Sequence, residues 1–222
     1  MGELAPGSAI WVVDLRLADV ALRRGDLAAA REHTRRIVER SDVGGDDCIF
    51  AQLEAAMIEL VAGDVARARR ELDAPLAYLA RTAGTERPDQ GHARAVVEAA
   101  VAAVELAAGD VDAARRLLPS AFATAVATTD MPVVAAVGLA VSAVALEDGD
   151  ARVAAEMLGA AAVLRGGDDP SHPLIRDLRD RLRAALGDEP FTAAYGRGRA
   201  MTREQALARL DPAASDPAAV GP

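Results

Sequence analysis

The chain has 222 residues, of which 51% are hydrophobic and 3% aromatic, enough to bury one sizeable core or to build an elongated array. Its formal net charge of −9 at pH 7 argues against nucleic-acid binding by this chain alone, since phosphate contacts need a clustered positive surface. A single cysteine excludes a disulfide framework, no apolar run is long enough to cross a membrane, and the first residues do not resemble a secretion signal, so we expect a cytoplasmic protein.

A short pattern that ends in Gly-Asp occurs four times along the chain. In every copy a Leu lies three residues before the Gly, a small residue lies seven before it, and an Ala lies five after it. The glycines are 38, 46 and 40 residues apart, and a recurring period near forty indicates an array of repeats. The pairs are Gly25 and Asp26, Gly63 and Asp64, Gly109 and Asp110, and Gly149 and Asp150.

Each position of this pattern has a physical role in a hairpin of two helices. Gly can adopt the left-handed conformation that closes a helix, and the following Asp can cap the free N–H groups of the next helix. The two small residues let the helices approach closely, and the Leu fills the space between them. Since residues that favour strands are not clustered, the sequence predicts an all-helical protein with turns at the four Gly-Asp pairs.

The hairpins predicted from this register cover residues 10–41, 47–83, 91–129 and 132–166. Loops are expected at residues 41–47 and 82–91, where glycines and a proline interrupt the helical pattern. Pro75 should kink or shorten the second helix of the second hairpin, because proline has no backbone N–H. Pro132 suits the first turn of the fourth hairpin.

Further helices are expected after the fourth hairpin, over residues 174–186, 189–195 and 202–210. Apolar residues line one side of the first of these helices, and Thr202 with Gln205 forms a capping-box pattern that opens the last. We expect these helices to cap the end of the array, so that residues 1–210 form a single domain. Residues 211–222 are rich in Ala, Pro and Asp and should be disordered.

The register of small residue, Gly-Asp and Ala resembles that of the tetratricopeptide repeat, with four matching copies between residues 11 and 166. The period is longer than the 34 residues typical of that family, and Ala, Leu or Val fills most of the family's aromatic positions. The resemblance implies a divergent, tetratricopeptide-like α-solenoid of four hairpins with C-terminal capping helices.

The C-terminal part carries a second resemblance. Residues 158–165 (LGAAAVLR), 186–191 (LGDEPF) and 195–202 (YGRGRAMT), then Glu204 and Ala206, are similar to the ending of large ATP-dependent bacterial transcription factors of the LuxR and SARP types. Those proteins combine a tetratricopeptide-like sensor domain with ATPase and DNA-binding modules, and they usually have Trp where this chain has Tyr195. Because the chain has no Lys for a phosphate loop and no basic recognition helix, it would be an excised sensor domain or a stand-alone relative.

The sequence indicates no enzyme, no metal site and no cofactor. His33, His92 and His172 lie far apart, with no second ligand at metal-binding spacing, and are expected in surface or packing positions. Cys48 has no signature of an activated nucleophile and should be a plain buried thiol. Residues 196–199 (GRGR) could bind phosphate, but the favoured interpretation is a turn whose arginines pair with an acid or a carbonyl.

In tetratricopeptide arrays the first helix of each hairpin lines a concave groove, and the resemblance implies such a groove here. We expect the groove to be open around Phe50, Leu53 and Met57, where it would suit an amphipathic helix, an extended apolar peptide or a hydrophobic small molecule. The alternative is a narrow groove that its own neighbours fill. Transferring the groove positions by their offset from each Gly gives Val12, Leu15, Asp19, Phe50, Leu53, Met57, Val61, Val96, Ala99 and Leu139.

These features predict a non-catalytic protein-interaction or ligand-sensing domain related to a bacterial transcriptional regulator. Its partner would be a protein or peptide, such as the ATPase and DNA-binding modules of a larger regulator or a second copy of the chain, and neither a nucleic acid nor a membrane. Two alternatives are a stand-alone scaffold that binds a protein partner, and a protein that binds a small molecule in the apolar groove.

Overall fold

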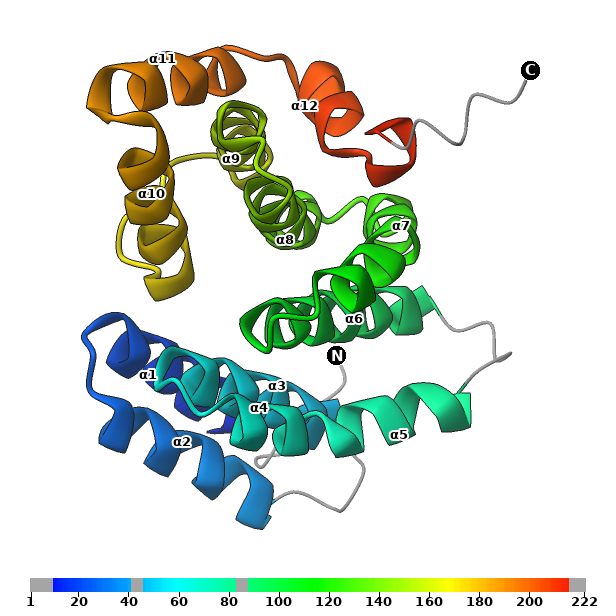
Figure 1. Cartoon of the computed structure of the whole chain (residues 1–222). Helices are drawn as coiled ribbons and strands as arrows, with labels where there is room; N and C mark the ends of the chain where they lie inside the picture. Colours follow the sequence, from blue (N-terminus) through cyan, green and yellow to red (C-terminus); the bar gives the residue numbers. More distant parts are fainter. Residues whose placement is uncertain (1–9, 41–45, 83–87, 216–222) are drawn as a thin grey trace. The chain divides into compact units, whose positions relative to one another are not determined.

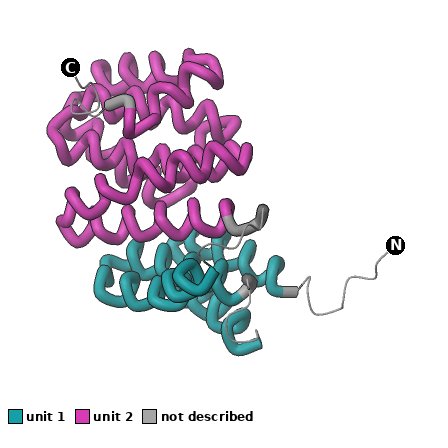
Figure 2. Tube along the Cα trace, turned by 90° about the vertical axis from the view of Figure 1, so that its right-hand side faces the viewer, with its two compact units in different colours: residues 1–85 teal, residues 86–222 magenta. Residues whose placement is uncertain are grey.

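A computed structural model describes residues 10–40, 46–82 and 88–215 of the chain. Within these ranges every regular element is a helix, which confirms the all-helical fold (Figure 1). The chain divides into two compact units, residues 1–85 and 86–222, which are described separately (Figure 2).

Unit 1 is built from two helical hairpins, of which the second has a broken second helix. Helix α3 packs against the other four helices of the unit, and a small core forms from Ala21, Leu22, Ala30 and Ile58. The helices are α1 (Ile10–Arg23), α2 (Leu27–Arg40), α3 (Asp46–Val61), α4 (Val65–Glu71) and α5 (Asp73–Thr82).

Pro75 explains the break between α4 and α5. The buried Pro75 is the third residue of α5, a position whose N–H has no partner within a helix, so proline removes no hydrogen bond there. One residue later, the N–H of Leu76 donates to the carbonyl of Leu72 at 3.0 Å. The second helix of the second hairpin is therefore shortened at this proline, as expected.

Unit 2 holds two further hairpins and a C-terminal group of helices. Helix α8 is central, because it packs against α6, α7, α9, α10 and α12, and its Val134, Val137 and Ala135 are fully buried. The helices are α6 (Pro88–Ala107), α7 (Val111–Ala127), α8 (Met131–Glu147), α9 (Ala151–Arg165), α10 (Pro173–Leu186), α11 (Asp188–Arg199), α12 (Arg203–Leu210) and the 3₁₀ turn η1 (Pro212–Ser215).

Each of the four Gly-Asp pairs lies between the two helices of a hairpin. The glycines have φ values of 78°, 81°, 84° and 88°, in the left-handed region that strains any side chain. The N–H of the following Asp donates to the carbonyl five residues earlier at 2.9–3.0 Å, which is the long bond of a Schellman motif. At Asp26, Asp64 and Asp110 the carboxylate also accepts the backbone N–H three residues later, at 2.8–3.0 Å. Asp150 makes no such side-chain bond.

The small residues of the repeat are buried in all four copies. All eight are 0% exposed, and the hydroxyl of Ser142 donates to the carbonyl of Ala154 at 2.7 Å. Side chains this small allow the helix backbones to approach closely, so each hairpin has a seam without bulky groups. The eight residues are Ala18, Ala30, Ala56, Ala68, Ala102, Ala114, Ser142 and Ala154.

The helices α9 and α11 cross at two glycines. A Cβ atom added to Gly198 would lie 2.0 Å from the carbonyl oxygen of Glu156, and one added to Gly159 would lie 2.3 Å from the carbonyl oxygen of Tyr195. Neither position can accept a side chain without moving a backbone. The two glycines therefore set the distance between these helices.

Three expectations from the sequence are wrong at the level of local structure. Residues 88–91 are not a loop, because α6 begins at Pro88, and proline fits a first helical position. Residues 196–199 are not a turn, because α11 continues to Arg199 across the glycine crossing. Residues 212–215 are not disordered but form η1, where Asp211 Oδ1 accepts the N–H of Ala213 at 3.0 Å. Residues 46–47 and 82, which were also expected in loops, belong to α3 and α5. The remaining parts of those expected loops, 41–45 and 83–87, and the tail 216–222 lie outside the described residues.

The left-handed glycines give a direct test of the hairpin turns. Gly109→Val should lower the free energy of unfolding by on the order of 1–2 kcal/mol through backbone strain alone, because an added Cβ meets no atom within 4 Å. Chemical denaturation measures this cost. Ala108→Val, one residue earlier at an exposed position, is the control and should cost less than about 0.7 kcal/mol; equal losses would contradict the turn assignment.

Two glycines of α11 give a matched test of the helix crossing. Gly198→Ala should destabilise the protein by at least about 2 kcal/mol, because its methyl group would overlap the α9 backbone. Gly196→Ala, two residues away at an exposed helical position with open space around it, should stabilise the protein by about 0.5–1 kcal/mol. The melting temperatures of both variants test this difference. Similar melting temperatures for the two variants would contradict the close crossing of α9 and α11 at Gly198.

Candidate interaction surface

The residues predicted to line a groove differ widely in exposure. In unit 1, Val12 is 40% exposed, whereas Leu15, Asp19, Phe50, Met57 and Val61 are partly buried. The expectation of an open lining is wrong for Leu53, which is 7% exposed and belongs to the core, because α3 is surrounded by the other helices of its unit.

In unit 2 the predicted groove residues pack against hydrophobic clusters. Val96 and Ala99 are partly buried against the cluster that includes Leu118, and Leu139 packs against the cluster of Leu158 and Leu182. These contacts correspond to the alternative in which neighbouring side chains fill the groove.

Aromatic stacking holds one of the predicted groove residues in place. The rings of Trp11 on α1 and Phe50 on α3 are stacked, with centroids 6.3 Å apart and an interplanar angle of 8°. Because its ring already has an intramolecular partner, Phe50 serves the packing of α1 on α3. The predicted centre of the groove thus consists of one core residue, Leu53, one stacked aromatic residue, Phe50, and the partly buried Met57.

Helix α1 also has an exposed apolar face, which lies on the side of the helix opposite to the predicted groove residue Leu15. Val13, Leu17 and Val20 are 59%, 43% and 43% exposed, and at about 100° per residue they lie within about 60° of one another around the helix. The buried residues Ala18 and Leu22 lie on the other side of the helix. We call Val13, Leu17 and Val20 the α1 outer face.

Sequence reasoning missed the α1 outer face because it transferred only the groove positions. A helical wheel would have shown that α1 carries apolar residues on two sides, beyond the single stripe of an ordinary amphipathic helix. Among the described residues, the other exposed large apolar side chains are Val12 beside this face, Val38 on α2 and Leu76 on α5.

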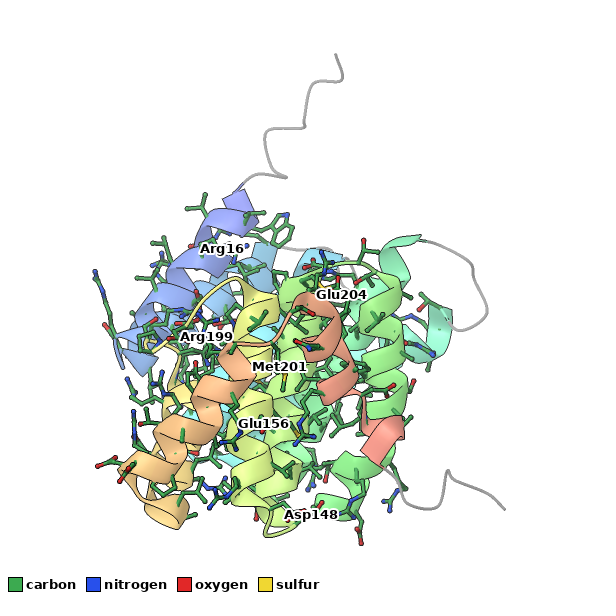
Figure 3. The ribbon with its side chains drawn as sticks, turned by 90° about the horizontal axis from the view of Figure 1, so that it is seen from above. Arg16, Asp148, Glu156, Arg199, Met201 and Glu204 are labelled. Atoms are coloured by element: carbon green, nitrogen blue, oxygen red, sulfur yellow. The ribbon has the colours of Figure 1, made fainter. Side chains whose placement is uncertain are left out.

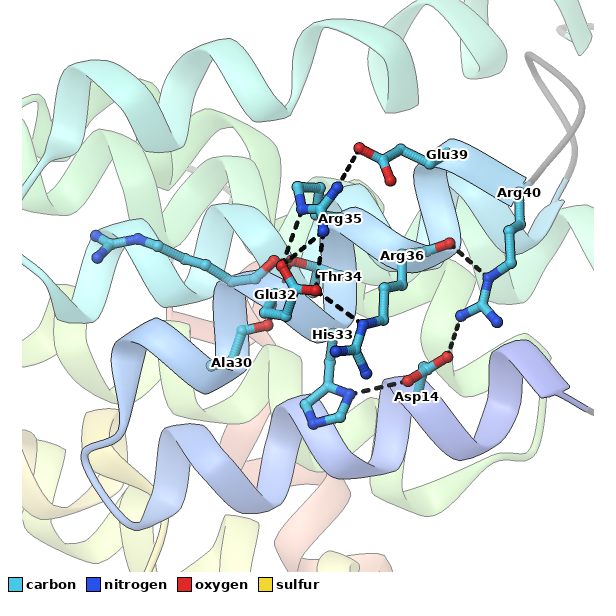
Figure 4. A network of polar contacts seen from close by, with 10 residues as sticks. Asp14, Ala30, Glu32, His33, Thr34, Arg35, Arg36, Glu39 and Arg40 are labelled. Atoms are coloured by element: carbon cyan, nitrogen blue, oxygen red, sulfur yellow. Dashed lines mark hydrogen bonds and ion pairs between the residues drawn. The ribbon is translucent and has the colours of Figure 1, made fainter.

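A polar network fixes the orientation of α1 against α2 (Figure 4). The carboxylate of Asp14 on α1 bonds the Nδ1 atom of His33 at 2.8 Å and forms an ion pair with Arg40, both on α2. The bond from His33 and the charge of Arg40 lower the pKa of Asp14, although its burial acts in the other direction. Asp14 lies about 90° around α1 from the outer face, so this network does not involve the outer face.

A second buried carboxylate joins α2, α3 and α4. Glu59 is 2% exposed, and Arg31 donates to its two oxygens at 2.8 and 2.6 Å in a bidentate pair. Arg67 approaches the same carboxylate at 3.2 Å. Such a pair has the geometry in which arginine binds a carboxylate most strongly, so Glu59 ties three helices together.

Glu54 on α3 is a buried carboxyl group of a different kind. Its Oε1 atom is buried and has no hydrogen-bond partner in the described part of the chain. Burial raises the pKa of Glu54 to about 7, and the negative charge of Asp19 adds to this effect, while Arg23 and Arg16 oppose it. Near neutral pH this group therefore changes its charge inside the fold.

The residues that carry the C-terminal resemblance make structural contacts around α9 (Figure 3). Glu156 of α9 binds Arg197 of α11 at 3.1 Å and Arg209 of α12 at 2.8 Å. Arg199 lies 3.3 Å from Asp168, so the arginines of the GRGR segment do pair with acids, although they do so from a helix.

Aromatic rings complete the same end of unit 2. Phe191 and Tyr195 are stacked on one face of α11 with centroids 5.7 Å apart, and the guanidinium of Arg183 on α10 lies 4.7 Å from the centre of the Phe191 ring. The Tyr195 hydroxyl bonds Asp168. Leu178 and Leu182, which lie on the first of the expected capping helices, are buried in the same cluster as Phe191. These residues hold α10 and α11 against α9.

The described ranges contain no group of three or more His, Cys, Asp or Glu side chains that could hold a metal ion. None of their helices is long and apolar enough to cross a membrane. Comparison with models of protein families, with curated proteins and with solved structures finds no match.

The raised pKa of Glu54 predicts a pH dependence of stability. A carboxyl group whose pKa is higher in the folded state stabilises the fold below its unfolded value of 4.5, and this contribution is lost as the pH rises through about 7. Glu54→Gln should therefore raise the free energy of unfolding at pH 8.5 by on the order of 2–3 kcal/mol relative to the native chain, with a much smaller difference at pH 4.

Urea denaturation across pH 4–9 measures this effect. Glu39→Gln on α2, which alters only an exposed ion pair with Arg35, is the control and should follow the native pH profile with an offset below about 1 kcal/mol. A Glu54→Gln variant whose profile parallels that of the native chain would show that Glu54 is not held in a protonated state.

Proposed function

We propose that this chain is a non-catalytic protein-interaction domain that uses the α1 outer face to bind another protein surface. The observation that carries this proposal is the exposure of Val13, Leu17 and Val20 on one side of a well-packed helix. Apolar side chains clustered in water on a folded helix favour a contact that removes them from water, worth about 25 cal/mol per Å² buried.

The resemblance of the C-terminal part favours a role in a bacterial transcriptional regulator. Three of the residues that carry it join α9 and α11: Gly159 and Gly198 lie at the crossing of the two helices, and Arg197 pairs with Glu156 of α9. This use supports a fold shared with the sensor domains of such regulators, and fold alone does not define function. We propose the sensor or interaction role, with the ATPase and DNA-binding modules of a larger regulator as candidate partners.

A stand-alone scaffold is the second candidate, and the same surface supports it. The third candidate function, binding of a small molecule in the predicted groove, is disfavoured because the groove residues are used for packing. Leu53 is buried, and the groove residues of unit 2 pack against its hydrophobic clusters, namely Val96, Ala99 and Leu139. Coding sequence for an ATPase module in frame with this chain would favour the regulator over the scaffold.

The interaction role predicts the behaviour of a surface variant. Replacing Val13, Leu17 and Val20 together by Gln keeps a good helix former at each position and removes the apolar contact. The variant should lose at least about tenfold in affinity for a protein partner, since 1.4 kcal/mol of contact energy corresponds to that factor.

Affinity capture from extracts of the native cells, with each partner identified and then titrated by calorimetry, measures this loss. Leu76→Gln on α5 replaces a residue of similar exposure, 44%, and should bind as the native chain does. If the triple variant and the native chain bound every partner equally, the α1 outer face would have no role in binding. ATP hydrolysis or duplex DNA binding by the purified chain at physiological salt would contradict a passive interaction domain.

A further inference from the structure

We propose that α12 is a displaceable intramolecular ligand, and that the surface beneath it is a docking site for a basic amphipathic helix of a protein partner. This surface lies on α8 and α9, the helices of unit 2 on which α12 packs. We call it the α12 site and define it by Gly138 on α8 and by Glu156 and Ala161 on α9. It is a different surface from the α1 outer face, which belongs to unit 1.

A missing side chain on α8 makes room for Leu210 of α12. A Cβ atom added to Gly138 would lie 2.9 Å from Leu210 Cδ1 and 3.3 Å from the Cβ atom of Ala161. The Leu210 side chain therefore lies directly on the α8 backbone, and it is 0% exposed. Glycine weakens the interior of a helix, so its presence in the middle of α8 is explained by the space that this leucine needs.

The repeat pattern shows that this space is particular to the fourth hairpin. Gly138 lies eleven residues before the turn glycine of its hairpin. At the same offset the other three hairpins have polar side chains, namely Asp14, Gln52 and Glu98. Only in the hairpin without a side chain at this position does a leucine from another helix fill the space, so the α12 site receives a residue from outside its hairpin.

Helix α12 binds this site as an amphipathic ligand helix. Ala206 and Leu210 lie four residues apart on one face and are both 0% exposed, and Leu207 packs against the same hydrophobic cluster. Next to Leu210, Arg209 binds Glu156. The site therefore selects a helix with the pattern Ala-Leu-x-Arg-Leu, which is helix-in-groove recognition with one basic contact.

Arg209 can leave the site without leaving an unpaired carboxylate behind. Its Nε atom donates to Glu156 Oε1 at 2.8 Å, while Arg197 of α11 donates to Oε2 of the same carboxylate at 3.1 Å. Glu156 thus keeps an arginine partner when α12 departs. Its Oε1 atom is then available to a basic residue of another helix.

The other hydrogen bonds of the α12 segment are internal and would move with it. Thr202 and Gln205 bond each other at both ends of the capping box, at 3.2 and 2.9 Å, and Asp211 Oδ1 accepts the N–H of Ala213 at 3.0 Å. With eight residues, α12 is too short to be a stable helix by itself in water. Its helical state therefore depends on docking, and a helix held by so few buried side chains opens more easily than a core helix.

Hydrogen–deuterium exchange of the full native chain tests whether α12 is displaceable. The amides of residues 206–210 should be protected at least about tenfold less than those in the middle of α8 and α9, because they exchange through local opening. Arg209→Gln should lower the protection of α12 further, by about threefold or more, since it removes the ion pair to Glu156. Arg203→Gln, at an exposed position of the same helix, is the control and should change it by less than about twofold.

Equal protection of α12, α8 and α9 would overturn the inference, because α12 would then open only when the whole unit unfolds. Equal effects of Arg209→Gln and Arg203→Gln would overturn the assigned contact with Glu156.

A peptide added in trans tests the docking site. The probe is a fluorescent synthetic peptide with the sequence of residues 200–215, titrated with full-length chain up to several hundred micromolar. It should bind the Leu210→Gln chain at least about tenfold more tightly than the native chain, in which the tethered α12 competes at an effective concentration of about a millimolar. A peptide that itself carries Leu210→Gln should bind the same variant at least about tenfold more weakly.

Equal binding by the native chain and the variant would overturn the docking site, and so would equal binding of the two peptides. Circular dichroism checks that each chain keeps its helical content. If Leu210→Gln does not fold, Arg209→Glu replaces it, because like charges at Glu156 then release α12 while the space over Gly138 stays intact. The unmodified peptide, which has Arg at this position, should bind Arg209→Glu more tightly than the native chain, and failure to do so would overturn the inference.

Discussion

The close approach of paired helices is the constraint on which both units depend. Each hairpin has one fully buried small residue on either helix, such as Ala18 and Ala30 in the first, and in the fourth the hydroxyl of Ser142 donates to the carbonyl of Ala154. A larger side chain there would push the helices apart, and a closely packed interior cannot absorb such a change cheaply. The left-handed glycine that ends the first helix of each pair makes the turn short enough to bring these residues together.

The same constraint explains why α1 has an unpartnered apolar side. Its contact with α2 uses Ala18 and the residues near it, and the bonds of Asp14 to His33 and Arg40 hold α2 on that side. Trp11 is held by Phe50 of α3. These contacts leave Val13, Leu17 and Val20 exposed, which is why the proposed function assigns the interaction to this face.

The sequence predicts turns and helix caps, which depend on a few consecutive residues, and it misses features that depend on packing between helices. The turns at the four Gly-Asp pairs follow from the backbone needs of one or two residues, and the capping box of Thr202 and Gln205 is present in full at the start of α12. The helix at residues 196–199 could not be predicted from local needs, because two glycines close together usually indicate a turn. Here Gly198 is required for a different reason, since the backbone of α9 leaves no space for a side chain at that position. The burial of Leu53 likewise depends on the helices around α3 and not on the pattern along it.

The candidate site was the least predictable part. Offsets taken from a repeat pattern identify the positions that face a groove, but they do not reveal whether the groove is filled or whether the opposite side of α1 is apolar. Glu54 shows the same limit, since the sequence contains no sign that its carboxyl group lies buried beside Asp19 with its pKa near neutrality.

The central claim is that the α1 outer face binds another protein surface, and hydrogen–deuterium exchange of the chain, alone and mixed with a protein partner captured from extracts of the native cells, tests it most directly. Amides of α1 should exchange more slowly in the mixture, because binding opposes local opening of this helix. Amides of α4 and α9 should exchange at the same rates in both samples. Exchange of α1 that the partner does not change, or a slowing confined to other helices, would contradict the claim.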